Sequence, residues 1–465
     1  MMTSPLPDPD RLFPGDAETR AIARDLHARI VDAPIVSPHG HVPVSWLADD
    51  VPFSDPAALL VSHDHYVTRL LHASGVHLGD LGVGDSAVAP REVWRRFAER
   101  WSLFAGTASG YWIGEELREI LHIDVELSAA TADAVYDAIQ AQLERPDFRP
   151  RALFERFGIE VLATTDDPLD DLAGHAALAE SGLSGRVLPT FRPDRYIDAT
   201  SATFGENVAR LLAAESVPGT FGGYLDALRA RRHHFIDHGA TATDHGIEVP
   251  LTVDLDPAEA ESLFQSVLAR DATPEQRQAF AGHMLVQMAG MSVEDGLVMA
   301  LHAGVVRNHS TATFERFGPD TGADFPRRSD FVRGLRPLLE RYGLEKDFHL
   351  VVFAVDETVY SREIAPMASF YPSVYIGAPW WFLDAPDAMA RFRAATTESA
   401  GFSRGSGFID DTRAFLSIPA RHDTARRADA AFLARLVREG RLTETAAGTI
   451  IDDIVGPQPK RVFKL

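Results

Sequence analysis

The chain has 465 residues, of which 45% are hydrophobic and 24% charged, with no cysteine and a formal net charge of −22. The absence of cysteine excludes disulfides, cysteine–zinc sites and thiol nucleophiles, so any metal must be held by His, Asp or Glu. The negative charge argues against nucleic acid and anionic membranes as partners, and no apolar run approaches the ~18 residues of a membrane span.

The N-terminal stretch lacks the basic and apolar segments of an export signal, so we expect a cytoplasmic protein. Short apolar runs then recur along the chain and predict strands that are buried on both faces. There are eight of them: residues 33–37, 159–165, 186–191, 240–245, 297–302, 348–355, 373–378 and 407–410. Most are separated by segments with helical periodicity. This alternation predicts an α/β fold, a (β/α)8 barrel of the TIM type, with a doubly wound open sheet as the alternative.

Two helices carry clear start signals. Thr273 is followed by Pro274 and by Gln276, which predicts a capping box, and Asp256 precedes Pro257 in the same way. The gap between the first two strands is too long for one helix, so residues 48–158 are interpreted as a helical insertion after strand one. We expect residues 1–465 to form a single barrel domain, with a peripheral helical extension over 420–465.

The first strand ends in His39-Gly40-His41. In an extended segment residues i and i+2 point to the same face, so both imidazoles could reach a single ion, and Gly40 leaves room beside them. Neutral imidazole suits zinc, iron, nickel or manganese. An isolated pair of this kind can also simply decorate a loop.

Polar residues also follow the other predicted strands. The carboxyl ends of barrel strands carry the chemistry, so these residues are candidates for one site. They are Asp166 and Asp167, Arg192 and Asp194, Asp244 and His245, His302, Arg307, Asn308 and His309, Trp380 and Trp381, and Asp410, Asp411 and Arg413. Asp166, Asp167 and Asp244 are interpreted as turn or supporting residues.

Several longer stretches make the pattern specific. They are "HGH" (39–41), "DHYVTRLLHASG" (64–75), "TTDDPLDDL" (164–172), "LPTFRPD" (188–194), "LHAGVVRNHSTATFERFGPDTG" (301–322), "PWWF" (379–382) and "DDTRAFLSIPARHDTARR" (410–427). With these stretches in order, the whole chain resembles the uronate (glucuronate) isomerases of the amidohydrolase superfamily. It has "HGH" and "RNHS" where that family more often has "HCH" and "RNNN", which keeps the histidines and changes the pocket wall.

The resemblance implies an aldose–ketose isomerase of hexuronates, which moves a proton between C2 and C1 through an enediolate: D-glucuronate to D-fructuronate and D-galacturonate to D-tagaturonate. It implies one divalent metal ion, with zinc expected and manganese or iron as alternatives, held by His39, His41 and Asp411. Asp411 would also carry the proton, whereas its neighbour Asp410 would face the other way. His302 would contact the metal or its water, unless it is a core histidine.

Other roles follow from the same resemblance. His65 and Tyr66 would reach over the pocket as acid and as hydroxyl donor to sugar oxygens. Arg192 and Arg413 would grip the substrate carboxylate, which answers how an acidic protein binds an anion, although both could instead pair with nearby acids. Trp380 and Trp381 would pack on the apolar face of the sugar, with one of them serving the core instead.

Two other functions remain open. A metal-dependent amidohydrolase or lactonase could use the same His39, His41 and Asp411 to activate water, but the arginines suit a sugar acid and no lysine stands at a strand end for a second metal. A non-catalytic barrel that binds sugar acids would not need the metal and acid set. The sequence leaves open the preferred hexuronate, the native metal and a possible homo-oligomer.

Overall fold

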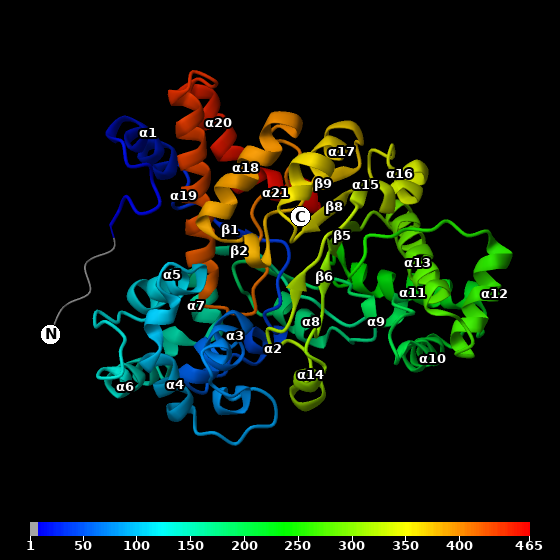
Figure 1. The fold of residues 1–465 in the computed structure, drawn as a ribbon, viewed down its shortest axis with the longest axis horizontal. Coiled ribbons are helices and arrows are strands. Elements are labelled where there is room, and N and C mark those ends of the chain that lie inside the picture. Colours follow the sequence, from blue (N-terminus) through cyan, green and yellow to red (C-terminus); the bar gives the residue numbers. More distant parts are fainter. Residues whose placement is uncertain (1–7) are drawn as a thin grey trace.

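The computed structural model describes residues 8–465, and a barrel of parallel strands lies at its centre. Figure 1 shows the strands surrounded by helices, with the helical segment after β1 on one side and α10–α13 on the other. The strands are β1 (Ile35–Ser37), β2 (Ile159–Ala163), β3 (Arg186–Leu188), β4 (Ala242–Ile247), β5 (Val298–Ala303), β6 (Val305–Val306), β7 (Phe325–Pro326), β8 (Leu350–Ala354) and β9 (Val374–Ile376).

The barrel strands pair in parallel in the order of the chain. One sheet has the order β1-β2-β3 and the other β4-β5-β8-β9, while β6 and β7 form a small antiparallel hairpin between β5 and β8. An isolated parallel bridge between Phe191 and Thr243 connects the two sheets. The order is the one that a (β/α)8 barrel requires, so the predicted architecture holds.

The prediction of an eighth strand at residues 407–410 was wrong, because these residues do not form a regular strand. This part of the chain forms one parallel bridge, from Gly405 to Ile376, with two backbone hydrogen bonds at 2.8 Å, and His41 N donates to Thr412 O at 2.9 Å on its other side. Positive φ angles at Gly407 (78°) and Asp411 (42°) break the extended geometry that a regular strand needs. The segment still lies between β9 and the residues after β1, so it occupies the eighth position of the ring.

Helices follow most of the barrel strands, as the alternation predicts. They are α8 (Ala173–Glu180), α9 (Asp194–Ile197), α10 (Phe204–Glu215), α11 (Phe221–Asp237), α12 (Pro257–Leu268), α13 (Pro274–Asp295), α14 (Thr311–Phe317), α15 (Phe331–Gly334), α16 (Arg336–Tyr342), α17 (Ala365–Phe370) and α18 (Pro386–Ala400). The two predicted caps are confirmed. Thr273 with Gln276 and Asp256 with Glu259 form capping boxes at the starts of α13 and α12.

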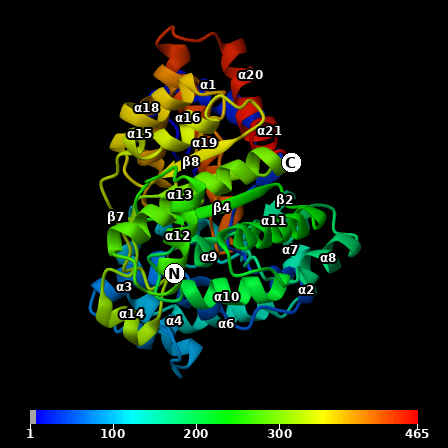
Figure 2. The same cartoon turned by 90° about the vertical axis from the view of Figure 1, so that its right-hand side faces the viewer.

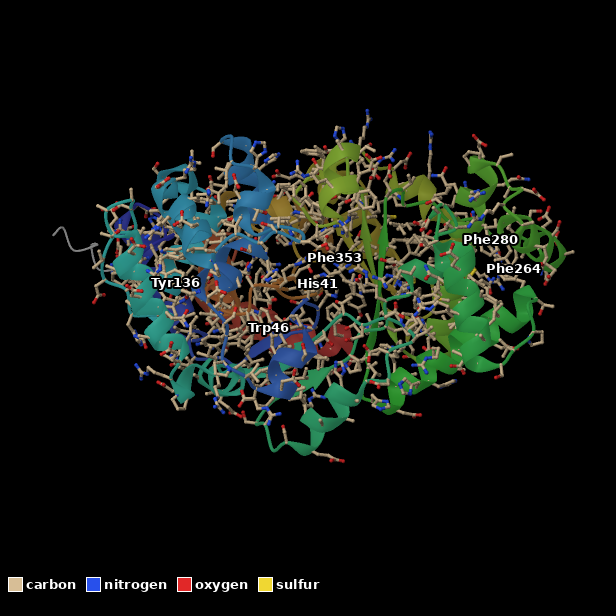
Figure 3. The ribbon with its side chains drawn as sticks, turned by 90° about the horizontal axis from the view of Figure 1, so that it is seen from below. His41, Trp46, Tyr136, Phe264, Phe280 and Phe353 are labelled. Atoms are coloured by element: carbon tan, nitrogen blue, oxygen red, sulfur yellow. The ribbon has the colours of Figure 1, made fainter. Side chains whose placement is uncertain are left out.

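Between β1 and β2 the chain is almost entirely helical. The helices are α2 (Val44–Asp49), α3 (His65–Ala73), α4 (Pro90–Glu99), α5 (Ala108–Glu115), α6 (Ala132–Leu143) and α7 (Pro150–Arg156), with short 3-10 or π turns such as Glu116–Ile120 between them. They bury a hydrophobic core against β1–β3, and Trp94, Phe97 and Tyr136 contribute to it from the helical side. Figure 3 shows Tyr136 far from His41, on the opposite side of these helices.

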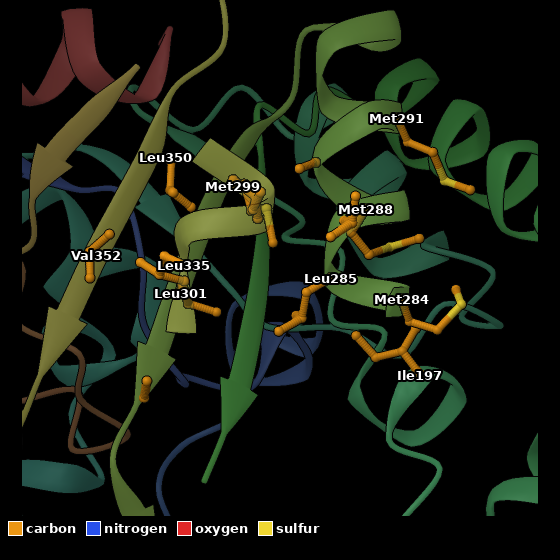
Figure 4. Close-up of a cluster of buried hydrophobic side chains, with 14 of the residues drawn as sticks. Ile197, Met284, Leu285, Met288, Met291, Met299, Leu301, Leu335, Leu350 and Val352 are labelled. Atoms are coloured by element: carbon orange, nitrogen blue, oxygen red, sulfur yellow. The ribbon is translucent and has the colours of Figure 1, made fainter. Parts of the chain in front are cut away.

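The largest core packs the barrel against α10–α13 and α15–α18. Met284, Leu285 and Met288 on α13 belong to the same buried cluster as Met299 and Leu301 on β5, and Leu285 lies on the side of α13 nearest the strands (Figure 4). On the outer side of α13, Phe264 and Phe280 stack with their ring centroids 5.9 Å apart, and Figure 3 places them at the end of the molecule away from the site. This packing makes the barrel wall a rigid support for the residues at its strand ends.

The C-terminal helices are α19 (Ser417–Arg438), α20 (Glu444–Val455) and α21 (Pro457–Phe463). The expectation of a peripheral extension from residue 420 was wrong for α19, because most of that helix is buried. It packs on α1 (Ala17–Ala28), on α18 and on α5, and the turned view in Figure 2 shows α1, α18 and α20 gathered at the same end. No helix in the described part of the chain is both long and apolar enough to cross a membrane.

One glycine after β9 links the fold to the site. A Cβ on Gly377 would lie 2.4 Å from the ring of Phe353, which closely approaches this backbone from β8. The other face of Phe353 stacks on His302 with centroids 4.1 Å apart and an interplanar angle of 12°. The lack of a side chain at Gly377 therefore lets Phe353 support His302.

We expect Gly377→Ala to destabilise the fold by about 1–3 kcal/mol, since the ring of Phe353 must move and the packed core resists it. The measurement is the free energy of unfolding by chemical denaturation. Gly40→Ala is the matched control, because the atoms nearest a Cβ at Gly40 lie at 3.5 Å or more, which is ordinary contact distance. Equal stability of both variants would contradict the role given to Gly377.

Candidate active site

A cavity of about 520 Å³ opens at the carboxyl ends of the barrel strands, beneath α3 and the β6–β7 hairpin. Its wall carries cations and anions side by side. The charged residues that line it are Arg192, Arg195, Arg307, Arg413 and Arg421, together with Asp64, Asp320, Asp324 and Asp411. Most of the residues predicted for the site line this cavity or the cluster of side chains at its base.

His39 and His41 lie just beyond the end of β1 rather than within the strand. His39 is only 2% exposed, whereas the side chain of His41 is 25% exposed and borders the cavity. Their rings meet edge to face with centroids 5.1 Å apart. The expectation that both rings lie on one face of a strand was therefore wrong. The two histidines lie in an irregular segment after β1, and both rings still contact Asp411.

Three side chains form the tightest group of possible metal ligands among the described residues. One ligand atom each from His39, His302 and Asp411 lies within 4.8 Å of the other two. Oδ1 of Asp411 is 3.3 Å from Nε2 of His39 and 3.0 Å from Nε2 of His41. His302 thus takes the place in this group that the sequence gave to His41, while His41 contacts the same carboxylate from the cavity side.

This group fits a divalent cation. Oδ1 of Asp411 and Nε2 of His302 are buried and lack a well-formed hydrogen bond, although Oδ1 lies 3.0 Å from Nε2 of His41. Buried polar atoms are costly when unpaired, so their convergence indicates a ligand that they share. Two imidazoles and a carboxylate with room for further ligands are a usual donor set for zinc, manganese or iron.

Asp244 supports the cluster from below, which agrees with its interpretation as a supporting residue. It is 1% exposed, and its Oδ1 accepts a hydrogen bond from Nδ1 of His302 at 2.6 Å. That contact fixes the proton on Nδ1 and leaves Nε2 free as a ligand. Burial alone would raise the pKa of Asp244, but the charges of Arg192 and His302 hold it well below its usual value.

Asp410 and Asp411 point in different directions. Oδ2 of Asp410 lies 3.0 Å from Nε2 of His422 in a buried pair. Asp411 instead faces His39 and His41, and their charges hold its pKa well below the usual value although burial acts to raise it. The geometry places Asp411, and not Asp410, at the cavity.

Arg192 and Arg413 reach the cavity and also make the ion pairs that the alternative interpretation foresaw. Arg192 contacts Asp244 at 3.1 Å and Asp194 at 2.9 Å, whereas Arg413 contacts the half-exposed Asp320 at 3.3 Å. Sequence reasoning gave no role to Arg307, whose guanidinium lies 4.5 Å from the ring centre of Trp381 in the cavity wall. Its place in the "RNHS" stretch was the available signal.

His65 and Tyr66 are the first residues of α3, which begins with Asp64 as its N-cap. Burial and the charge of Arg413 lower the pKa of His65 to about 3, so its imidazole is neutral at ordinary pH. The hydroxyl of Tyr66 donates to Asp384, with its oxygen 3.1 and 3.2 Å from the two carboxylate oxygens. We expected from the sequence that the hydroxyl of Tyr66 donates its proton to a sugar oxygen. In the structure this proton is directed at Asp384, which does not line the cavity.

Trp380 and Trp381 follow β9, and both line the cavity. Trp380 packs edge to face on His302, with centroids 4.7 Å apart, and its buried Nε1 has no hydrogen-bond partner. Trp381 lies beside His65, with centroids 5.4 Å apart. Both aromatic rings are thus close enough to the cluster to form an apolar wall.

Arg421 on α19 is the main site residue that the sequence reasoning missed. It is 3% exposed, borders the cavity and donates from NH1 to Oδ2 of Asp384 at 2.8 Å. Burial raises the pKa of Glu116 to about 8, with a further rise from the charge of Asp64, while the charge of Arg421 acts to lower it. The signal was its position in the long "DDTRAFLSIPARHDTARR" stretch, but nothing local indicated its partners.

A (β/α)8 barrel with a His–His–Asp cluster at its strand ends and arginines facing the same cavity defines an amidohydrolase-type enzyme with an anion-binding site. Comparison with known proteins gives the particular family. The glucuronate isomerase family model matches residues 17–463, so this chain belongs to the glucuronate isomerase family.

Similar proteins agree over the full length. The uronate isomerase of Corynebacterium efficiens is 53% identical, with 100% of both chains covered, and that of Rhizorhabdus wittichii is 50% identical over 98% of each chain. The crystal structure of glucuronate isomerase from Caulobacter crescentus has a TM-score of 0.96 at 45% identity and covers 98% of this chain and 96% of its own. The uronate isomerase structure from Thermotoga maritima gives 0.92 at 27% identity, covering 98% and 99%.

These findings confirm the family resemblance and the barrel that the sequence predicted. They also favour an isomerase, an intramolecular oxidoreductase, over the metal-dependent hydrolase that was the alternative.

Proposed function

We propose that the chain interconverts a hexuronate aldose and its ketose, with D-glucuronate and D-galacturonate as substrates. The observation that carries the proposal is that the buried His–His–Asp cluster reaches, through Asp411, the same cavity that several arginines line. The cavity volume of about 520 Å³ falls within the range of small-molecule sites. Membership of the glucuronate isomerase family supports the same substrate class.

In the proposed reaction Arg192 and Arg413 hold the substrate carboxylate, and Arg413 exchanges its contact with Asp320 for the ligand. Asp411, which is ionised because its pKa is low, takes the proton from C2 and returns it to C1 through the enediolate. His65 and Tyr66 contact the sugar oxygens from above. Trp380 and Trp381 exclude water along the apolar face of the sugar.

We also propose one divalent metal ion, with zinc as the expected ion and manganese or iron as alternatives. His39, His302 and Asp411 would hold it, with His41 beside the same carboxylate. When bound, the ion would supply positive charge for negative oxygen in the reaction, as a Lewis acid does. Asp244 would keep His302 in the tautomer that binds a metal.

The direct test is incubation with D-glucuronate, D-galacturonate and neutral hexoses such as D-glucose. We expect ketose formation from the uronates and none from the neutral sugars, because the arginines select for a carboxylate. Ketose products are measured by chromatography. Equal turnover of glucose and glucuronate would refute the carboxylate grip.

Asp411→Asn should lower turnover by about 10²–10⁴, the usual share of general acid–base catalysis, because the amide cannot accept the proton. Steady-state kinetics measure it, with solvent proton exchange at C2 as a second readout. Asp410→Asn is the control: it loosens a buried pair with His422 and should reduce stability more than turnover. If Asp410→Asn abolishes turnover and Asp411→Asn does not, the assignment is reversed.

His302→Asn should lower the metal content per chain well below one, because it removes a buried ligand whose tautomer Asp244 fixes. Elemental analysis of the purified protein measures it. His283→Asn is the matched control, since His283 is 1% exposed on α13 and bonds to Leu255 N outside the cavity. Full metal content in the His302 variant would contradict the proposed ligand set.

A further inference from the structure

The hydroxyl of Tyr66 is part of a buried chain that leads away from the cavity. It donates to Asp384, and Oδ2 of Asp384 also accepts from NH1 of Arg421 at 2.8 Å. Tyr66 and Arg421 line the cavity, whereas Asp384 is not among the described residues that do so. Asp384 is 4% exposed, so it is enclosed by protein and not open to a ligand in the cavity.

Arg421 is itself held firmly. Its Nε donates to Ser417 Oγ at 3.0 Å, and its NH1 also reaches the carbonyl of Asp410 at 3.4 Å. Its guanidinium lies 3.7 Å from the ring centre of Trp112, and the same ring packs edge to face on Tyr66. The partners of Asp384 therefore have little freedom to turn.

A phenol has one proton to donate. While that proton is directed at Asp384, the lone pairs of the oxygen are left for the cavity. We propose that Asp384, fixed by Arg421, is a positioning residue that makes Tyr66 accept, rather than donate, the hydrogen bond to a substrate hydroxyl. This inference rests on the proposed function, in which Tyr66 contacts the sugar.

The protonation states agree with this direction. Burial raises the pKa of Asp384 to about 6, while Arg421 acts against that rise, so the carboxyl is ionised at neutral pH and accepts. Burial and the charge of Asp384 raise the pKa of Tyr66 well above its usual value, so the phenol keeps its proton. Tyr66 is a neutral donor facing an anionic acceptor.

The experiment is a double-mutant cycle with Tyr66→Phe and Asp384→Asn, assayed with D-glucuronate. An asparagine at 384 would turn its carbonyl oxygen to Arg421 and its NH2 to Tyr66, which reverses the direction of the phenol proton. We expect each single variant to lower kcat at least tenfold with a smaller change in KM. The double variant should match Tyr66→Phe, because Asp384 acts only through the hydroxyl.

The outcomes separate the two claims. Unchanged kcat in Tyr66→Phe would overturn the role of Tyr66 in the proposed function, and this inference with it. A loss in Tyr66→Phe with losses that add in the double variant would overturn the inference alone. If Asp384→Asn does not fold, Asp384→Glu, which keeps an acceptor but shifts it by one methylene, enters the same cycle, and whatever loss of kcat it causes should be absent in the Tyr66→Phe background.

Asp429→Asn is the matched control. Asp429 accepts two hydrogen bonds from Arg393, at 2.6 and 2.8 Å, in a comparably buried pair between α18 and α19. Thermal unfolding should show a loss of stability for this variant, as for Asp384→Asn, but kcat should stay at the wild-type value. A similar fall in kcat for Asp429→Asn would show a general effect of broken ion pairs and would overturn the positioning role.

Discussion

The site depends on one buried carboxylate, that of Asp244. Its side chain is 1% exposed, and its two oxygens face different partners, His302 at 2.6 Å and Arg192 at 3.1 Å. An unpaired charge at this depth would cost several kcal/mol, so neither partner can leave without a penalty. The same residue thereby fixes the imidazole that we propose as a metal ligand and one of the arginines that we propose to bind the substrate.

The surrounding packing keeps this arrangement in place. Phe353 stacks on one face of His302, and the ring of His39 stacks near the other with centroids 4.7 Å apart. Trp380 closes the edge of the same imidazole. Figure 3 shows Phe353 and His41 near the centre of the molecule, between the helices after β1 and those that cover the barrel. An imidazole enclosed on three sides has little freedom, which is the preorganisation that catalysis needs.

Patterns that repeat locally allowed much of the fold to be predicted. Buried strands, helix caps such as Thr273, and the alternation of strand and helix are properties of short windows, and they gave the barrel. The eighth strand could not be recognised as irregular, because its break depends on left-handed backbone at Asp411 and at a glycine. The prediction that the C-terminal helices are peripheral was wrong for α19 for a similar reason. The helices that bury α19, such as α1 and α5, are distant from it in the sequence.

The same limit applies to the site. His39, Asp411 and Arg192 follow predicted strands, so the barrel geometry alone placed them on one rim. Arg421 and Asp384 lie 37 positions apart in the sequence, and Tyr66 lies more than 300 positions before either. No spacing rule connects such residues. Only the family resemblance drew attention to the stretches that contain Tyr66 and Arg421, and it gave no sign that Asp384 lies between them.

The net charge of −22 and an anionic substrate are compatible because electrostatic interactions in water act over short distances. At physiological salt the screening length is about 8 Å, so exposed acids beyond that range contribute little to the cavity. Arg192 and Arg413 would meet a carboxylate at contact distance inside a partly dehydrated wall, where attraction is much stronger. Their acidic partners differ in burial: Asp244 is enclosed, whereas Asp320 is 41% exposed. Arg413 can therefore release its partner to solvent at little cost, while Arg192 stays paired, so an incoming carboxylate would gain most of its new contact from Arg413.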